Sequence, residues 1–479
     1  MSEYSQLPPE EEGDRIALRA HINGEAQIPI SRRPTRGRDR VWVALFIIHL
    51  IAAGLFILLE KKDVDNPVLQ SALVGAWTSM SMSSSILGSF LGALSIFLLS
   101  TSEARYFLLS SALPISVIIL VCLANIFFVF GEKLMLLGIA SLITSCWFSS
   151  YYRKARDGLN FSSAIISFVG DVSMKYGKAL PIFCGSLVFI HTCVMLGWGV
   201  YLINVLAEIS TKYSVLLIVL IFLSFYWITK VFQTLIGFVV GGCFVWYFIR
   251  DEGEAFAPRE RLRLYILCAL TTSLGSLLKS GLLSGLCDNL LMIHLWTDVH
   301  VVPLSTGLSS DSSSEYAPPR AYPTSCKARL KRLVRWILSP LLPVLSRYHR
   351  LSIYMSAVYG QTLSLGGLAF YGHYYHTLEL ALHDLTRFNL TCIAVEVGGI
   401  MSLVFGLFSF TENNGVLAEG VFFAMIFYLA FSGISLCLES YKAAVDGLIV
   451  AFAINPERLS KENQFVYLRY LRESDYSLR

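Results

Sequence analysis

The stretch VWVALFIIHLIAAGLFILL, residues 41–59, contains no Asp, Glu, Lys or Arg. An α-helix rises about 1.5 Å per residue, so about 20 apolar residues in helical form cross the roughly 30 Å hydrocarbon core of a bilayer. Comparable apolar runs recur along most of the chain. The sequence therefore predicts an all-α fold, a polytopic bundle of transmembrane helices.

The overall composition leads to the same conclusion. The 479 residues are 55% hydrophobic and 15% charged, whereas soluble domains have about 25% charged residues. The mean hydropathy is +0.60. A soluble core cannot absorb this excess of apolar surface, but a bilayer can, so the composition excludes an ordinary soluble protein and makes the lipid bilayer the main partner.

The two ends of the chain are polar. Five arginines precede the first apolar run: Arg32, Arg33, Arg36, Arg38 and Arg40. By the positive-inside rule they predict a cytosolic N-terminus. We expect residues 1–40 to be a disordered cytosolic tail and residues 455–479 to be a cytosolic C-terminal tail. The first 30 residues lack the pattern of a cleavable signal peptide, so the first span is expected to direct insertion.

The apolar runs predict about ten spans across residues 41–454. After residues 41–59 they fall at about 84–102, 107–130, 134–151, 179–206, 213–249, 264–290, 351–377, 389–410 and 416–438. Residues 160–177 resemble an amphipathic interfacial helix. Residues 213–249 are too long for one straight span, and their glycines favour a broken or tilted helix.

The topology of residues 264–388 stays open in the sequence. A Ser/Pro-rich, then basic, loop occupies residues 299–350 and should be cytosolic. A cytosolic position of this loop conflicts with a full span at residues 351–377. Two alternatives resolve the conflict: residues 351–377 are re-entrant or interfacial, or residues 264–298 form a hairpin near Lys279. The glycines Gly237, Gly241 and Gly242 are expected to allow close helix packing.

Motifs of enzymes and ATP-driven pumps are absent from the sequence. It has no Walker loop, no GxSxG and no HExxH, and its cysteines form no CxxC pair. We therefore expect no enzymatic activity, no catalytic residues, no metal site and no cofactor. A pore, a facilitator or a secondary transporter remains, and nothing suggests a nucleic-acid partner.

Ionisable residues inside apolar runs are the first pointer to a functional site, because each is costly in a bilayer unless it is paired or hydrated. They are Lys230, Lys279, Asp288, Glu396, Glu439 and Asp446. Two interpretations compete. Glu439, Lys442 and Asp446 can simply mark a helix end, and Lys230 can pair with a carboxylate. Alternatively, Glu396, about two turns into its span, contributes to substrate binding or proton transfer.

Aromatic residues are the second pointer. Tyr226, Trp227, Trp246 and Tyr247 flank the long region 213–249, with Gln233 between them. They can be interfacial anchors. They can also form a cage for a quaternary ammonium, which lacks N–H donors and binds aromatic faces with about 2 kcal/mol each when desolvated.

Four stretches carry a family resemblance. They are YWITKVFQTLIGFVVGGCFVWYF (226–248), ALTTSLGSLLKSGLL (269–283), HRLSIYMSAVYGQTLSLGG (349–367) and ESYKAAVDGLIVAFAINPE (439–457). In order and spacing the chain resembles the choline transporter-like family, of the fungal, plant or protist type with a short first extracellular loop. Thr234, where the family commonly has Asn, departs from the pattern.

The resemblance implies a plasma-membrane transporter of choline or a related small organic cation, by facilitated diffusion or proton-coupled exchange. The substrate-binding residues expected are Tyr226, Trp227, Gln233, Trp246, Tyr247 and Glu396. Two other functions remain open: a lipid transporter or scramblase, and a non-transporting membrane scaffold. The sequence leaves the oligomeric state undetermined.

Overall fold

A computed structural model describes residues 39–59, 67–129, 135–207, 214–250, 257–298, 333–359, 363–373, 384–408 and 416–478. The secondary structure of these residues is helical throughout, without a β-strand, which confirms the predicted all-α fold. Residues 1–38 of the predicted N-terminal tail, residues 1–40, lie outside the described residues.

The helices up to the middle of the chain are α2 (Arg40–Leu59), α3 (Pro67–Ser100), α4 (Ser102–Val129), α5 (Met135–Asp157), α6 (Leu159–Met174), α7 (Ala179–Ala207), α8 (Ser214–Ile236), η2 (Gly237–Gly241) and α9 (Gly242–Ile249). Those that follow are α10 (Pro258–Leu270), α11 (Leu274–Asp298), η3 (Ser339–Leu341), α13 (Leu342–Tyr348), α14 (Ser352–Tyr359), α15 (Leu363–His373), α17 (Leu385–Phe408), α18 (Val416–Ile454), α19 (Pro456–Glu462) and α20 (Gln464–Leu478).

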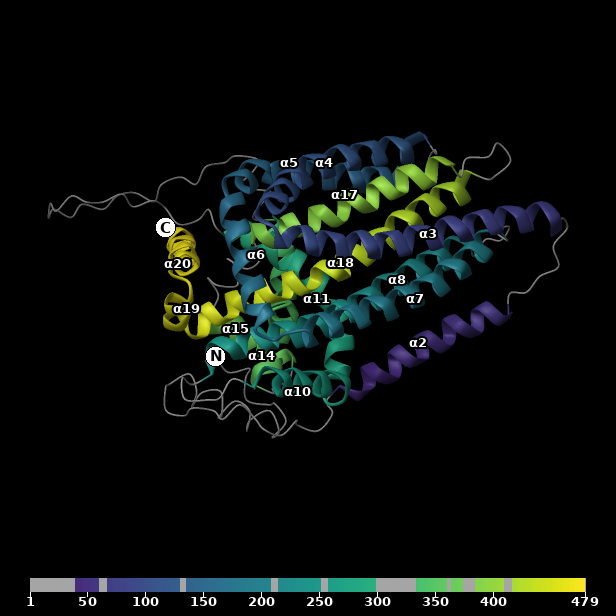
Figure 1. The fold of residues 1–479 in the computed structure, drawn as a ribbon. Helices are drawn as coiled ribbons and strands as arrows, with labels where there is room; N and C mark the ends of the chain where they lie inside the picture. Colours follow the sequence, from purple (N-terminus) through teal and green to yellow (C-terminus); the bar gives the residue numbers. More distant parts are fainter. Residues whose placement is uncertain are drawn as a thin grey trace.

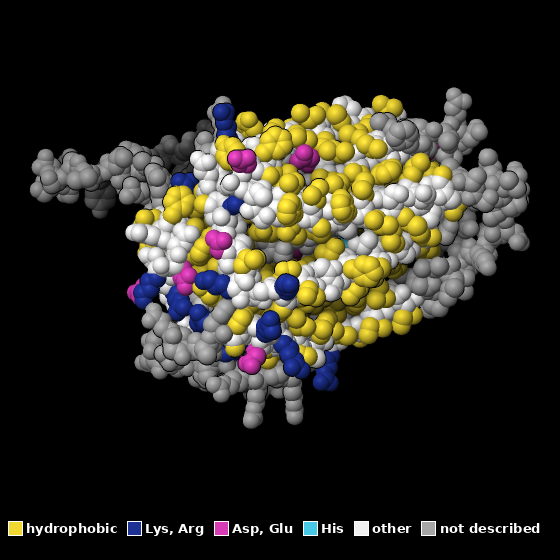
Figure 2. Space-filling model, viewed as in Figure 1, with side chains coloured by type: hydrophobic (Ala, Val, Ile, Leu, Met, Phe, Trp, Pro, Cys, Tyr) yellow, Lys and Arg dark blue, Asp and Glu magenta, His cyan; other side chains and the backbone are white. Residues whose placement is uncertain are grey.

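The axes of the long helices α3, α4, α7, α8, α17 and α18 are roughly aligned, parallel or antiparallel, and form a bundle (Figure 1). Hydrophobic side chains cover much of its outer surface (Figure 2), as expected for a surface in contact with lipid. Among the described residues, seven helices are long and apolar enough to cross a membrane, or up to eight if a bent pair is counted as one span. The predicted count of about ten spans is therefore not confirmed.

The predicted long region 213–249 is one continuous helical path rather than two separated pieces. A π-helical turn at Gly237–Gly241 joins α8 to α9, and Val219–Ile249 forms one candidate span of 31 residues. A Cβ at Gly241 would lie 2.1 Å from the Tyr354 ring and 3.2 Å from the Ala443 carbonyl oxygen. The predicted role of this glycine in close packing is confirmed.

The segment 258–298 does not form the hairpin considered from the sequence. Helices α10 and α11 meet at a bend of 76°, and the break lies at residues 271–273 rather than at Lys279. In this region residues 352–359 form α14 and residues 363–373 form α15, and neither is long enough for a full span, which agrees with the re-entrant or interfacial alternative. Residues 374–383 lie outside the described part.

The predicted interfacial segment 160–177 is largely α6, whose buried side chains Ile165 and Val169 belong to the main hydrophobic core. The C-terminal tail folds as α19 and α20 and packs at the end of the bundle where α6 lies (Figure 1). There Tyr470 contacts the rings of Phe161 and Phe452, both at 5.5 Å between centroids.

Candidate functional site

A cavity of about 380 Å³ lies inside the bundle between α5, α8, α11, α17 and α18. Its wall combines aromatic rings with ionisable and amide groups. The lining residues include Trp147, Phe148, Tyr151, Tyr226, Thr229, Lys230, Gln233, Gly285, Asp288, Asn289, Arg350, Asp384, Arg387, Phe388, Thr391, Tyr428, Phe431, Ser435, Glu439 and Lys442. A cavity of this size can hold a small organic molecule.

The start of α17 positions the first charged group of the wall. Asp384 caps the helix, because its carboxylate accepts hydrogen bonds from the backbone N–H of Thr386 (3.0 Å) and of Arg387 (3.1 Å). Burial raises the pKa of the Asp384 carboxyl to about 6, and the nearby Asp446 carboxylate adds to this rise. The cap fixes the first turn of the helix, and with it the direction in which the Arg387 side chain extends.

Arg387 joins two carboxylates of α18. Its Nη1 donates to Asp446 Oδ2 at 2.6 Å, and its Nη2 donates to Glu439 Oε1 at 3.3 Å. Glu439 and Asp446 are seven residues apart, so they lie on one face of α18 two turns apart. Asp446 is fully buried and needs such partners, since an unpaired buried carboxylate is costly.

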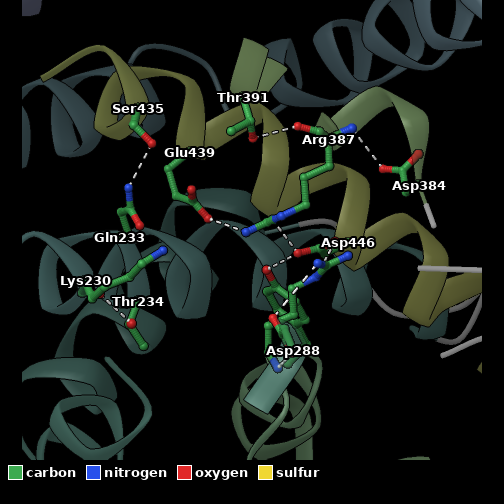
Figure 3. A network of polar contacts seen from close by, with 12 residues as sticks. Lys230, Gln233, Thr234, Asp288, Asp384, Arg387, Thr391, Ser435, Glu439 and Asp446 are labelled. Carbon is green, nitrogen blue, oxygen red and sulfur yellow. Dashed lines mark hydrogen bonds and ion pairs between the residues drawn. The ribbon is translucent and has the colours of Figure 1, made fainter. Parts of the chain in front are cut away.

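The network continues to α11 and α14 (Figure 3). The Tyr354 hydroxyl donates to Asp446 Oδ2 at 3.0 Å, and Arg350 Nε lies 3.3 Å from Asp446 Oδ1. The backbone N–H of Arg350 donates to Asp288 Oδ1 at 2.9 Å. Arg350, Arg387 and their carboxylates thus connect α11, α14, α17 and α18 at the polar side of the cavity.

A neutral polar contact spans the cavity wall between α8 and α18. Gln233 Nε2 donates to Ser435 Oγ at 2.9 Å (Figure 3). One turn earlier on α8, Lys230 also lines the cavity, and Lys442 of α18 does the same. No described residue provides a hydrogen-bond acceptor or a carboxylate within ion-pair distance of either lysine ammonium. The predicted Lys230–carboxylate pair is therefore absent from the described residues.

Aromatic rings form the less polar part of the wall. Phe388 of α17 lies 4.9 Å from Phe148 and 5.2 Å from Tyr151 of α5, measured between ring centroids. Tyr226 of α8 and Tyr428 of α18 line the cavity from other helices. The cavity therefore offers ring faces from four helices to a ligand.

The cavity brings together two of the six residues predicted from the sequence, Tyr226 and Gln233. Trp227 lies outside the lining, where its Nε1 donates to the Leu278 carbonyl oxygen at 3.1 Å. Trp246 is fully buried next to the guanidinium of Arg261, 4.8 Å from the ring centroid.

The remaining two predicted residues also lie outside the cavity lining. The Tyr247 hydroxyl donates to Glu462 Oε1 of α19 at 3.0 Å. Glu396 Oε2 is buried and has no hydrogen-bond partner in the described structure. The four flanking aromatic residues therefore do not line one common cavity here, and their role in substrate binding stays a prediction.

The structure corrects one interpretation of three charged residues in and beside the cavity. The interpretation that Glu439, Lys442 and Asp446 mark a helix end is wrong, because α18 continues to Ile454. The rule that intramembrane charges indicate function identified Lys230 and Asp288 as well. It did not identify Arg350, Arg387 and Asp384, because they precede or begin helices and lie outside the continuous apolar runs. Among the described residues, no group of three or more His, Cys, Asp or Glu side chains can hold a metal ion.

The apolar outer surface, the long helices and the internal cavity define a multi-pass membrane protein with room for a small ligand in its bundle, the class that includes transporters. Residues 139–457 match the family model described as plasma-membrane choline transporter, so the chain belongs to this family. The resemblance found in the sequence is thereby confirmed, and the family makes the chain a membrane transporter. No curated protein matches the chain in a sequence comparison.

Proposed function

We propose that this protein transports choline or a related organic cation, and that the cation binds in the cavity between α5, α8, α11, α17 and α18. The observation that carries the proposal is the lining of this cavity, which presents aromatic rings from four helices beside the carboxylate of Glu439. Membership of the choline transporter family supports the choice of substrate.

The wall suits a quaternary ammonium. Such a cation has no N–H donor, so it gains little from carbonyl acceptors and binds best over aromatic faces. Tyr226, Tyr428 and the cluster around Phe388 supply these faces. Glu439 uses Oε1 to accept from Arg387, and its carboxylate is the counter-charge that we assign to the bound cation.

The membrane potential is a sufficient driving force for facilitated uptake. A cation that moves inward across about 100 mV gains about 2.3 kcal/mol, which corresponds to about fifty-fold accumulation. Proton-coupled exchange is the alternative mechanism, with Glu396 as the titrating group. Its buried, unbonded Oε2 atom in the described structure supports this assignment.

The distribution of charge supports an orientation. Lys and Arg gather toward the left and lower part of Figure 2, over the end of the bundle where α10, α19 and α20 lie. By the positive-inside rule we assign this end, with the C-terminal helix α20, to the cytosol; the five arginines before residue 41 assign the N-terminus to the same side, and the family suggests the plasma membrane.

Uptake of radiolabelled choline into proteoliposomes tests the proposal. With purified protein, saturable uptake should rise when an inside-negative potential is imposed, and unlabelled choline should suppress it. Absence of uptake by folded protein would contradict the proposal. Movement of fluorescent lipid in the same vesicles would then favour the lipid transporter or scramblase, and absence of both fluxes would favour the scaffold.

A further inference from the structure

The ionisable groups of the cavity wall differ in whether they have hydrogen-bond or ion-pair partners. Its acidic residues are Asp288, Asp384 and Glu439, and its basic residues are Lys230, Arg350, Arg387 and Lys442. Fully ionised, the lining carries four positive and three negative charges, and Asp446 behind it, paired with Arg387 and Arg350, supplies a fourth negative charge. The ionisable groups are therefore balanced before a ligand enters, and a bare cation adds one uncompensated positive charge.

Each carboxylate of the wall already has a partner. Asp288 accepts from the backbone N–H of Arg350, and Glu439 accepts from the Arg387 guanidinium. Asp384 accepts two backbone N–H groups at the start of α17. Asp288 and Asp384 therefore compensate an arginine and a helix end, whereas Glu439 is bonded through Oε1 alone and remains the counter-charge assigned to the bound ammonium.

The two lysines are in the opposite situation. Lys230 comes from α8 and Lys442 from α18; both interact electrostatically with the Glu439 carboxylate, which also pairs with Arg387, and Lys442 is in addition repelled by Lys230. Lys442 has only 3% of its surface exposed. Neither ammonium has a hydrogen-bond acceptor or an ion-pair partner among the described residues. Two like charges held in a membrane-embedded cavity are stabilised when an anionic group lies between or beside them.

We propose that the cavity binds a zwitterion, a small solute that carries a quaternary ammonium and an anionic group, with Lys230 and Lys442 binding the carboxylate or phosphate of the solute. The aromatic rings bind the ammonium end. This inference rests on the proposed function, because it names the substrate class of the same cavity, and it requires both ends of the ligand to fit one site.

The pairing follows from the chemistry of the wall. Ammonium groups of lysine bind carboxylate and phosphate oxygens as compact point charges. Ring faces bind the methylated ammonium. One cavity of about 380 Å³ contains both kinds of group, so a ligand of a few carbon atoms between its charges can reach both. A zwitterion also leaves the charge balance of these groups unchanged, because its own two charges cancel.

Equilibrium binding to the purified full-length protein tests the inference. Labelled choline and labelled glycine betaine are measured separately, and phosphocholine is used as a competitor of both. We expect betaine or phosphocholine to bind at least as tightly as choline. Binding in phosphatidylglycerol vesicles is compared with that in phosphatidylcholine vesicles. A strong loss of solute binding only in phosphatidylcholine vesicles would identify the lipid headgroup as the ligand and overturn the assignment to a free solute.

The variants Lys230→Gln and Lys442→Gln test the residues. Each should weaken zwitterion binding relative to choline binding by about ten-fold, the factor for one charge-assisted hydrogen bond of about 1.4 kcal/mol. Lys279→Gln is the matched control, since Lys279 lies 4.0 Å from Asp39, outside the cavity lining, and it should leave the ratio unchanged.

The outcomes separate this inference from the proposed function. Choline binding without zwitterion binding would overturn the inference and leave choline transport standing. The inference is also overturned if Lys230→Gln and Lys442→Gln weaken zwitterion binding no more than choline binding. Binding of neither ligand by folded protein would reject the proposed function itself.

Discussion

Arg387 and Asp446 form an ion pair with 2.6 Å between Nη1 and Oδ2, in which the Asp446 carboxylate is fully buried. The pair joins the start of α17 to the C-terminal half of α18, beside the candidate substrate cavity. Asp446 also accepts from the Tyr354 hydroxyl, and Tyr354 packs on Gly241 in the π-helical turn. The ion pair therefore connects the cavity wall to the irregular turn between α8 and α9.

Neutralisation of Asp446 should destabilise the protein strongly. In the variant Asp446→Asn the partly buried guanidinium of Arg387 loses its closest counter-charge, and breaking a buried pair costs about 3–5 kcal/mol. The matched control is Glu462→Gln, which removes the half-exposed pair between Glu462 and Lys175 and should cost about 0–1 kcal/mol. Thermal unfolding in detergent compares the two variants, and equal losses would contradict the assigned importance of the buried pair.

Substitution of Gly241 should disturb the π-helical turn. An alanine Cβ there would lie 2.1 Å from the ring of Tyr354, and overpacking of this kind typically costs about 1–3 kcal/mol. At Gly185 of α7, a Cβ would meet no atom within 4 Å, so Gly185→Ala is the control. We expect a lower unfolding temperature for Gly241→Ala only. An unchanged temperature for both variants would mean that the turn tolerates a side chain.

Choline affinity should depend on pH through Asp384. Its folded-state pKa, raised by burial to about 6, means that the carboxylate becomes protonated as the pH falls from 7 to 5. The cavity then loses a negative charge, and the KM for choline should rise by about five-fold, which corresponds to about 1 kcal/mol. Uptake measured between pH 5 and pH 7 checks this.

The raised pKa of Asp384 also affects the stability of the folded protein, which this group increases at low pH, where it weakens choline binding. The folded state binds the Asp384 proton more tightly than the unfolded state, so the contribution of this group to stability falls as the pH rises from about 4 to about 6. Asp384→Asn retains a good helix cap and removes the titration. If the pH dependence of KM persists in Asp384→Asn, another group is responsible.

The two glutamates should have separable roles. Glu439→Gln removes the proposed counter-charge of the bound cation, so the KM for choline should rise about ten-fold, the loss expected for one interaction of about 1.4 kcal/mol. Glu396→Gln leaves the cavity lining intact. If Glu396 transfers protons, this variant abolishes the pH dependence of uptake that remains in Asp384→Asn. If transport and its pH dependence are unchanged in Glu396→Gln, proton coupling through this residue is rejected.

The aromatic residues distinguish the cavity from the flanking cage predicted from the sequence. Tyr226→Ala should raise the KM for choline by about ten-fold or more, since a desolvated cation–aromatic contact contributes about 2 kcal/mol. Trp246 is fully buried outside the cavity lining, so Trp246→Ala should mainly lower the yield of folded protein. A selective loss of choline affinity in Trp246→Ala, with normal yield, would support the flanking cage instead. Uptake and size-exclusion chromatography are measured together.

The membrane fold was predictable because hydrophobic length is a local property. The run 41–59 and the later apolar stretches correspond to helices of the bundle, and the glycine-rich part of 213–249 indicated a helical irregularity. The bend between α10 and α11 was not predictable in its position. The short helices α14 and α15 depend on packing against each other and against α9, α13 and the π-helical turn, which a hydropathy pattern does not contain.

The site was predictable only in part, for a geometric reason. Residues 226–247 are near one another in sequence, but they extend along a helix of several turns and face different neighbours. Tyr226 and Gln233 are two turns apart on one face of α8 and reach the cavity, whereas Trp227 turns toward Leu278. Arg387 and Glu439 meet only because α17 packs on α18, and long-range pairing of this kind leaves no periodic signal in a single sequence.

The position of bound choline is the most direct test of the account. A structure of the purified protein determined with saturating choline should contain ligand density in the cavity, with the trimethylammonium group beside Tyr226 or Tyr428 and within reach of the Glu439 carboxylate. Density next to Trp227 or Trp246, with an empty cavity between α8 and α18, would contradict the central claim that this cavity is the substrate site.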